Sequence, residues 1–221
     1  LITRLKQTGI KIAVITNATL MDDPGVRKDL GLADWVSVKV DSLDEKTWRR
    51  IDRPCRQLKF ADFLDGICQF AGDYKGMLVT ETMMVKNFND DSLLLEKNAR
   101  FIKKLNPSVS YLGIPTRPPA VAWAYPPKTD ALNQAYQIYS AGGLKTEYLI
   151  GYEGSQFAFT GDIESDILSI TAVHPMREDA VAAYLEKAGG DFTDIEKLIH
   201  ENKIQVSAYN GRKFFLRCLD R

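Results

Sequence analysis

Strand-like and helix-like segments alternate along the first 150 residues, and this alternation constrains the fold more than any other feature of the sequence. Apolar, mostly β-branched or alternating patterns typical of strands occupy residues 11–16, 35–41, 76–85, 109–114 and 147–150. Helical patterns occupy residues 24–30, 60–72, 92–105 and 129–141. Because parallel neighbours in a sheet need a crossover, usually a helix, this order predicts an α/β fold with a parallel sheet.

The second strand segment, WVSVKVD at residues 35–41, alternates strictly between apolar and polar residues. Its two faces carry Val36, Val38 and Val40 on one side, and Ser37, Lys39 and Asp41 on the other. A parallel strand that is buried on both faces reads as a continuously apolar run. The polar face therefore indicates a strand that lines a cavity, and it favours a partial (βα) barrel over a dense flat sheet.

In barrels of this kind the reacting groups gather at the carboxyl ends of the strands. Polar or polarizable residues stand at or just beyond the ends of several strand segments: Asn17, Asp41, Glu81, Met83, Thr116 and Arg117. We expect these side chains to surround one opening of the barrel.

Composition excludes several classes of protein. The chain has 29 basic and 29 acidic residues, so no global field attracts nucleic acid or an anionic membrane. No apolar run approaches the roughly 20 residues that a membrane span needs, and no signal peptide opens the sequence. The three cysteines are scattered, which argues against a disulfide framework and predicts a reducing, cytoplasmic location. Metal ligands are not expected within this sequence, because no cysteine has a ligand-spaced cysteine or histidine partner.

A glycine-rich connector at residues 151–162 predicts a domain boundary, between a partial barrel at 1–150 and a small domain at 163–221. Three helical segments, at 163–171, 177–187 and 191–202, precede two strand segments that flank Asn210-Gly211, a strong hairpin signal. Three helices followed by a hairpin predict a winged-helix domain. Residues 161–221 carry 11 acidic and 8 basic side chains, and the expected recognition helix is acidic, so we expect docking to protein or substrate, or closure over the barrel, rather than DNA reading.

Five segments of the first region carry a resemblance: VITNATL at 14–20, ADWVSVKVD at 33–41, IDRP at 51–54, ETMMVKNFND at 81–90 and IPTRPP at 114–119. In this order and spacing they resemble the radical S-adenosylmethionine (radical SAM) superfamily from its third barrel strand onward. More narrowly, they resemble the iron–sulfur oxidoreductases related to the wyosine tRNA-modifying synthase.

The resemblance implies a [4Fe–4S] cluster on three cysteines and S-adenosylmethionine, which is cleaved to a 5′-deoxyadenosyl radical that abstracts hydrogen from a substrate. It also implies a reductant such as flavodoxin or ferredoxin. The sequence departs from the family because it has neither the CxxxCxxC motif nor the glycine-rich motif of the second strand. Without these motifs we expect this fragment to bind no cluster and to be inactive. Residues 1–8 read like the tail of a helix, so we expect the chain to start inside a domain.

The resemblance also gives roles to individual residues. Asp41 is expected to accept hydrogen bonds from the cofactor ribose, and Lys39 to pair with the methionyl carboxylate. Glu81 matches a cofactor-contacting position of family barrels. Met83 offers a soft apolar surface for adenine, and Asn17 ends a strand at the same opening. Simpler interpretations stay open for each: an internal Lys39–Asp41 ion pair, a turn at Asn17, polar filling by Glu81 and core packing by Met83.

Thr116 and Arg117 are the candidates for substrate binding, because a guanidinium at a barrel mouth can grip a carboxylate or phosphate. The segment that contains them could equally be an ordinary rigid exit loop. The substrate class stays open between a peptide, a tRNA and a small molecule.

Three functions compete at this point. The first is a radical SAM enzyme of unknown substrate, of which this chain is the carboxyl-terminal portion. The second is a non-catalytic module in which a degenerate barrel and a winged helix bind protein or RNA. The third is an aldolase or lyase that uses Lys39 as a Schiff-base amine.

Overall fold

The structure, a computed structural model, describes residues 1–151, 154 and 157–218. It divides them into two compact units. The first unit contains residues 1–115 and 123–150, and the second contains residues 116–122 together with the chain from Gly151 onward. Within the expected connector at 151–162, positions 152, 153, 155 and 156 lie outside the described residues.

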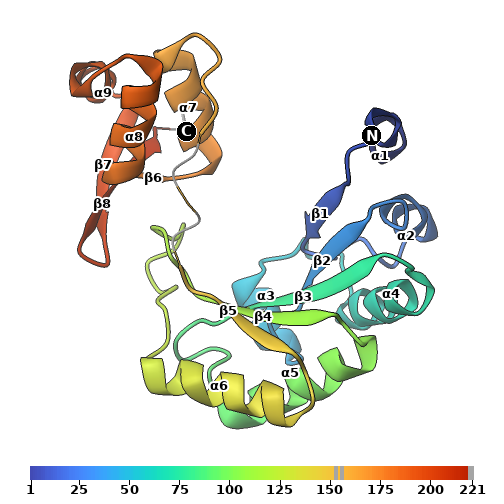
Figure 1. Cartoon of the computed structure of the whole chain (residues 1–221). Helices are drawn as coiled ribbons and strands as arrows, with labels where there is room; N and C mark the ends of the chain where they lie inside the picture. The colour runs from blue at the N-terminus through green and yellow to red at the C-terminus, as the bar shows by residue number, and fades with distance from the viewer. Residues whose placement is uncertain (152–153, 155–156, 219–221) are drawn as a thin grey trace. The chain divides into compact units, whose positions relative to one another are not determined.

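The first unit is built on a parallel sheet, as the alternating pattern predicted (Figure 1). Its strands, as described, are β1 (Ala13–Thr16), β2 (Trp35–Lys39), β3 (Met77–Met83), β4 (Val109–Gly113) and β5 (Thr146–Leu149). They lie side by side in the order β1-β2-β3-β4-β5, so each strand pairs with its neighbour in the sequence. The prediction of an α/β fold with a parallel sheet is confirmed.

The helices of the first unit precede or connect these strands. They are α1 (Ile2–Leu5), followed by the 3-10 turn η1 (Lys6–Thr8), then α2 (Pro24–Leu30), α3 (Glu45–Ile51), α4 (Phe60–Asp73), α5 (Ser92–Leu105) and α6 (Thr129–Ala141). The sequence did not predict α3. This helix has only seven residues, and Trp48 is its one fully buried side chain, so it shows no apolar periodicity. Asp44 caps its start by accepting a hydrogen bond from the Thr47 N–H at 2.8 Å.

The two faces of the sheet are different. Figure 1 shows α2, α4, α5 and α6 along one side of the sheet. Val36 and Val38 of β2 face this side and belong to the main core, together with Ile67 of α4 and Ile102 of α5. Because side chains alternate along a strand, the intervening residues of β2 and β3 point to the opposite face. The sheet is therefore packed on one face and presents its mixed polar side chains on the other.

The second unit combines three helices with a small antiparallel sheet among its described residues (Figure 1). Its elements are α7 (Ile163–Val173), β6 (Met176–Arg177), α8 (Glu178–Ala188), α9 (Phe192–His200), β7 (Ile204–Tyr209) and β8 (Arg212–Arg217). The three helices and the hairpin were predicted. The two-residue strand β6, which pairs with β8, was too short to give a sequence signal. Asn210 and Gly211 form the hairpin turn with φ of 48° and 71°, the backbone that a tight two-residue turn needs.

No helix in the described part of the chain has both the length and the apolar character needed to cross a membrane.

Candidate functional site

The candidate site lies where β2 and β3 end, on the face of the sheet opposite the helical core. Lys39 pairs in register with Glu81, Glu81 with Tyr111, and Tyr111 with Glu147. In-register neighbours of a parallel sheet point to the same side. These four side chains therefore form one polar row across β2, β3, β4 and β5, and Lys39 is the last residue of β2.

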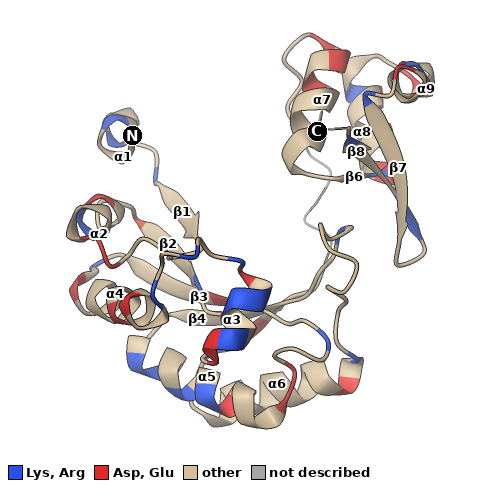
Figure 2. Ribbon diagram, turned by 180° about the vertical axis from the view of Figure 1, so that it is seen from behind, with Lys and Arg blue, Asp and Glu red and all other residues tan. Residues whose placement is uncertain are grey.

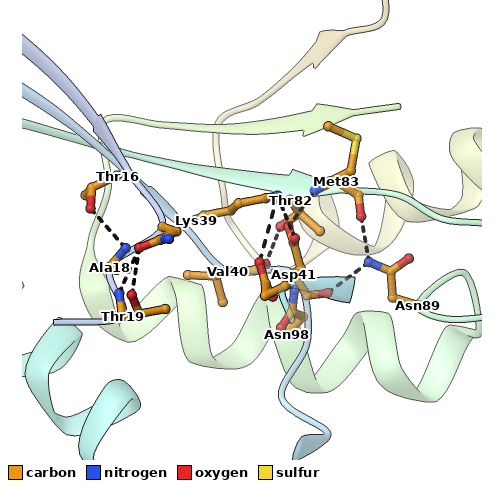
Figure 3. Close-up of polar contacts among 12 residues, drawn as sticks. Thr16, Ala18, Thr19, Lys39, Val40, Asp41, Thr82, Met83, Asn89 and Asn98 are labelled. Atoms are coloured by element: carbon orange, nitrogen blue, oxygen red, sulfur yellow. Dashed lines mark hydrogen bonds and ion pairs between the residues drawn. The ribbon is translucent and has the colours of Figure 1, made fainter. Parts of the chain in front are cut away.

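Lys39 is the centre of a charged cluster at this edge, and Figure 3 shows it beside Asp41. Its Nζ lies 3.1 Å from Oδ2 of Asp41 and 3.8 Å from Oδ1 of Asp52. The two carboxylate side chains are 0% and 8% exposed, whereas the Lys39 side chain is 30% exposed. The ammonium group thus connects two buried carboxylates to the surface. The internal Lys39–Asp41 ion pair, one of the two interpretations open from the sequence, is present.

Burial controls the protonation of this cluster. It raises the pKa of Asp41 above its ordinary value, against the opposing effects of Lys39 and of the Met83 N–H. Burial and then the charge of Asp41 raise the pKa of Asp52 to about 8. Burial alone would lower the pKa of Lys39, but the two carboxylates outweigh it, and the Lys39 pKa is raised. Burial thus favours the protonated forms of both carboxyl groups, and the carboxylates favour the protonated form of Lys39.

Side-chain amides fix the backbone around this cluster (Figure 3). Nδ2 of Asn89 donates to the carbonyl oxygens of Asp41 and Met83 at 2.9 and 2.8 Å, and its Oδ1 accepts from the Val85 N–H at 2.7 Å. Oδ1 of Asp41 accepts from the Met83 N–H at 2.8 Å. Deeper in the core, Asn98 donates to the carbonyl oxygen of Val40 at 2.9 Å. The ends of β2 and β3 are thus held as a rigid pair.

The structure places the other predicted site residues as follows. Asn17 is exposed after β1, and its Oδ1 accepts from the N–H and the hydroxyl of Thr19 at 3.2 and 2.9 Å. This is the local turn that the sequence left open as the simpler interpretation. Met83 is partly exposed at the end of β3. Thr116 and Arg117 belong to the second unit, where Arg117 Nη1 lies 2.6 Å from Nδ1 of His174.

Three residues of this edge were not singled out by sequence reasoning: Asp52, Asn89 and Asn98. Asp52 and Asn89 stand in the segments that carried the superfamily resemblance, so a signal for them was present. Asn98 gave no local signal, because a single polar residue on the buried face of a helix is visible only once the packing is known.

The described cysteines do not form a metal site. Cys55 and Cys68 are exposed and Cys218 is half-buried, and each is a free thiol. No group of three or more His, Cys, Asp or Glu side chains able to hold a metal ion occurs among the residues that the structure describes. The donor set here does not fit a [4Fe–4S] cluster.

Comparison with known proteins assigns the family. A UPF0026 protein of Methanocaldococcus jannaschii is 39% identical over 215 residues, which cover 96% of this chain and 67% of that protein. The chain belongs to the UPF0026 family. A second UPF0026 protein, from Synechocystis, is 35% identical over 113 residues. That match covers 51% of this chain and 42% of the relative. The aligned part is therefore less than half as long as that relative.

A more distant relative is an S-adenosylmethionine-dependent nucleotide dehydratase of Lacinutrix mariniflava. It is 27% identical over 113 residues, which cover 48% of the UPF0026 chain and 22% of that protein. No model of a protein family matches the sequence.

Two solved structures share the fold. One is a domain of a pyruvate-formate lyase-activating enzyme from Bacteroides vulgatus, with a TM-score of 0.54 and 20% identity. The match covers 68% of the UPF0026 chain and 87% of that domain. The other is a radical SAM methyltransferase from Sphaerobacter thermophilus, with a TM-score of 0.54, 16% identity, and 66% and 43% of the two chains covered. The UPF0026 chain therefore has a radical SAM-like fold, which confirms the predicted resemblance at the level of the fold.

Proposed function

We propose that the intact UPF0026 protein is a radical SAM enzyme and that this chain supplies part of its S-adenosylmethionine site. The observation that carries the proposal is the Lys39–Asp41–Asp52 cluster, which stands at the carboxyl edge of a radical SAM-like sheet. One relative is an S-adenosylmethionine-dependent nucleotide dehydratase and one structural neighbour is a radical SAM methyltransferase, and both support the proposal.

The polar row suits the charges of the cofactor. Lys39 is positively charged and partly exposed, so it can pair with the methionyl carboxylate. Glu81 stands beside it in register and can accept hydrogen bonds from the amino group. Met83 offers an apolar surface for adenine at the next outward-facing position of β3, and Asn17 follows β1 at the same edge. When bound, S-adenosylmethionine supplies the 5′-deoxyadenosyl group.

Asp41 has a different role in this proposal from the ribose contact expected from the sequence. Its carboxylate is fully buried and already accepts from the Met83 N–H. We therefore assign Asp41 and Asp52 to positioning: they hold the Lys39 ammonium at the edge of the sheet and fix the start of the loop after β3.

No step of cluster chemistry is assigned to this chain, because its described cysteines do not fit the cluster. The cluster ligands and the contact with flavodoxin or ferredoxin belong, in this proposal, to the intact protein. Thr116 and Arg117 remain the proposed substrate contacts. The carboxyl-terminal domain at 163–221 is proposed to be a winged helix joined through 151–162 to the barrel portion at 1–150.

Of the two alternative functions, the aldolase or lyase loses support and the binding module keeps it. A Schiff-base lysine needs a lowered pKa to be an unprotonated nucleophile, whereas the carboxylates raise the pKa of Lys39. The second candidate, a non-catalytic protein- or RNA-binding module with a degenerate barrel, is favoured by the lack of a fitting cluster site among the described residues.

The test uses the intact protein, reconstituted anaerobically with iron, sulfide and a chemical reductant. We expect it to convert S-adenosylmethionine to 5′-deoxyadenosine, measured by chromatography. Lys39→Gln should raise the KM for S-adenosylmethionine about tenfold or more, since it removes the charge that pairs with the carboxylate. Lys104→Gln, an exposed lysine of α5, is the matched control and should leave KM unchanged. A reconstituted protein that binds no cluster and forms no 5′-deoxyadenosine would leave the binding module as the better description.

A further inference from the structure

The strongest concentration of positive charge on the first unit lies on α3 and the loop that follows it. Residues 46–59 contain six basic side chains, Lys46, Arg49, Arg50, Arg53, Arg56 and Lys59, although the whole chain has no net charge. Asp52 is the one acidic residue in this stretch, and it is buried with a pKa raised to about 8. Figure 2 shows α3 as a largely basic helix. We call these six side chains the α3 basic surface.

Much of this charge is not used to hold the fold. Arg49 and Lys59 are exceptions: Arg49 pairs with Glu45 and donates to the carbonyl oxygen of Leu58, and Lys59 pairs with Asp62. Lys46, Arg50, Arg53 and Arg56 are exposed, and none of them forms an ion pair with another described residue. Such charges repel one another, so an anionic partner would relieve a cost that the isolated fold bears.

Two aromatic rings adjoin this charge. The Arg50 guanidinium lies 4.9 Å from the ring centre of Trp123 and 5.6 Å from that of Phe88. The centres of the two rings are 4.7 Å apart. Both rings are partly exposed and come from loops that are far from α3 in the sequence. Tertiary structure therefore brings two rings together with the planar cation of Arg50, and the exposed Arg53 and Arg56 follow Arg50 closely in the sequence.

We propose that the α3 basic surface, together with Phe88 and Trp123, binds single-stranded nucleic acid. Exposed arginines and lysines can neutralise successive phosphates, and bases stack on aromatic and guanidinium planes. An acidic protein would use the charges but would have less use for a paired ring platform. The proposal does not depend on S-adenosylmethionine chemistry, because the binding residues are separate from Lys39, Asp41 and Asp52.

The test is fluorescence anisotropy of this chain with a labelled mixed-sequence single-stranded RNA of about 12 nucleotides, at about 50 and 200 mM salt. Trp123→Ala should weaken binding about tenfold, and Trp123→Phe should preserve it, because a ring is retained. Arg53→Glu with Arg56→Glu should weaken binding more than tenfold and lower the slope of log K against log salt by about 1.4, for two phosphate contacts.

The matched control makes the same charge change elsewhere on this unit, with Lys28→Glu on α2 and Lys104→Glu on α5, two exposed lysines. It should weaken binding less than threefold. The proposal is overturned by an absence of binding, or by a control as damaging as the arginine pair. It is also overturned if an abasic oligomer binds as tightly as the RNA, or if polyglutamate competes as well as unlabelled RNA. Circular dichroism of every variant confirms that a lost signal is not lost folding.

Discussion

The ammonium nitrogen of Lys39 lies 3.1 Å from Oδ2 of Asp41, two residues further along the same strand edge. Asp41 is fully buried, and Asp52, at the end of α3, approaches Lys39 from a second direction at 3.8 Å. A helix and a strand end are therefore joined through one charged side chain. This junction has consequences for stability and for the role of each residue.

Asp52→Asn should change how stability depends on pH. The pKa of Asp52 is raised from an ordinary value near 4 to about 8, so the folded state favours its protonated form. The contribution of Asp52 to the stability of the folded state is fully present below about pH 4 and is lost as the pH rises to about 8. We expect the free energy of unfolding of the wild type, relative to Asp52→Asn, to fall by about 1–3 kcal/mol across this range. Urea unfolding at several pH values measures this difference, and parallel curves for the two proteins would contradict it.

Asn89→Ala should destabilise the first unit by about 2–4 kcal/mol. Its side chain makes three buried hydrogen bonds, to the backbone of Asp41, Met83 and Val85, and its removal leaves these groups without their partner. Asn17→Ala is the control, because Asn17 is exposed and bonds only locally to Thr19 among the described contacts, and it should cost less than about 0.5 kcal/mol. Equal costs in denaturant titration would show that Asn89 does not fix the strand ends.

Two glycines of α4 should respond in opposite ways to alanine. A Cβ on Gly66 would lie 2.4 Å from the backbone carbon of Met21, so Gly66→Ala should destabilise the fold by about 1–3 kcal/mol. Gly72 has open space around it, and Gly72→Ala should stabilise the helix by about 0.5–1 kcal/mol. Thermal unfolding of the two variants measures both effects, and the same sign for both would refute the close approach of α4 to the loop after β1.

The outer edge of β1 should promote self-association of this chain. Within the described sheet, β1 pairs with β2 alone, and Ile15 on β1 is 76% exposed. Exposed apolar edge strands pair readily with other chains. We expect sedimentation velocity at tens of micromolar to show oligomers that Ile15→Lys removes. Leu93→Lys, on an exposed position of α5 that is 66% exposed, should leave them in place. A monomeric wild type would be the contrary result.

The sequence by itself determined the elements of both units wherever their periodicity was strong. The patterns at 92–105 and 129–141 match α5 and α6 at both ends, because the buried face of an amphipathic helix appears in the sequence as apolar residues at three- and four-residue spacing. The pattern at 24–30 also matches α2 at both ends. The parallel order of β1 to β5 followed from strand and helix alternation. The hairpin followed from Asn210-Gly211.

Tertiary structure decided what each polar residue does. The sequence predicted that Lys39, Asp41 and Glu81 lie at one edge of the sheet. Only the packing shows that Asp41 is fully buried and that Asp52 completes the cluster. Hydrophobic periodicity did not predict the α3 helix or the contact between Arg50 and Trp123. It also did not predict the hydrogen bonds of Asn89 to the strand ends. The physical reason is that hydrophobic periodicity is a local property of the chain, whereas burial, pKa and hydrogen bonding depend on residues that are distant in sequence and near in space.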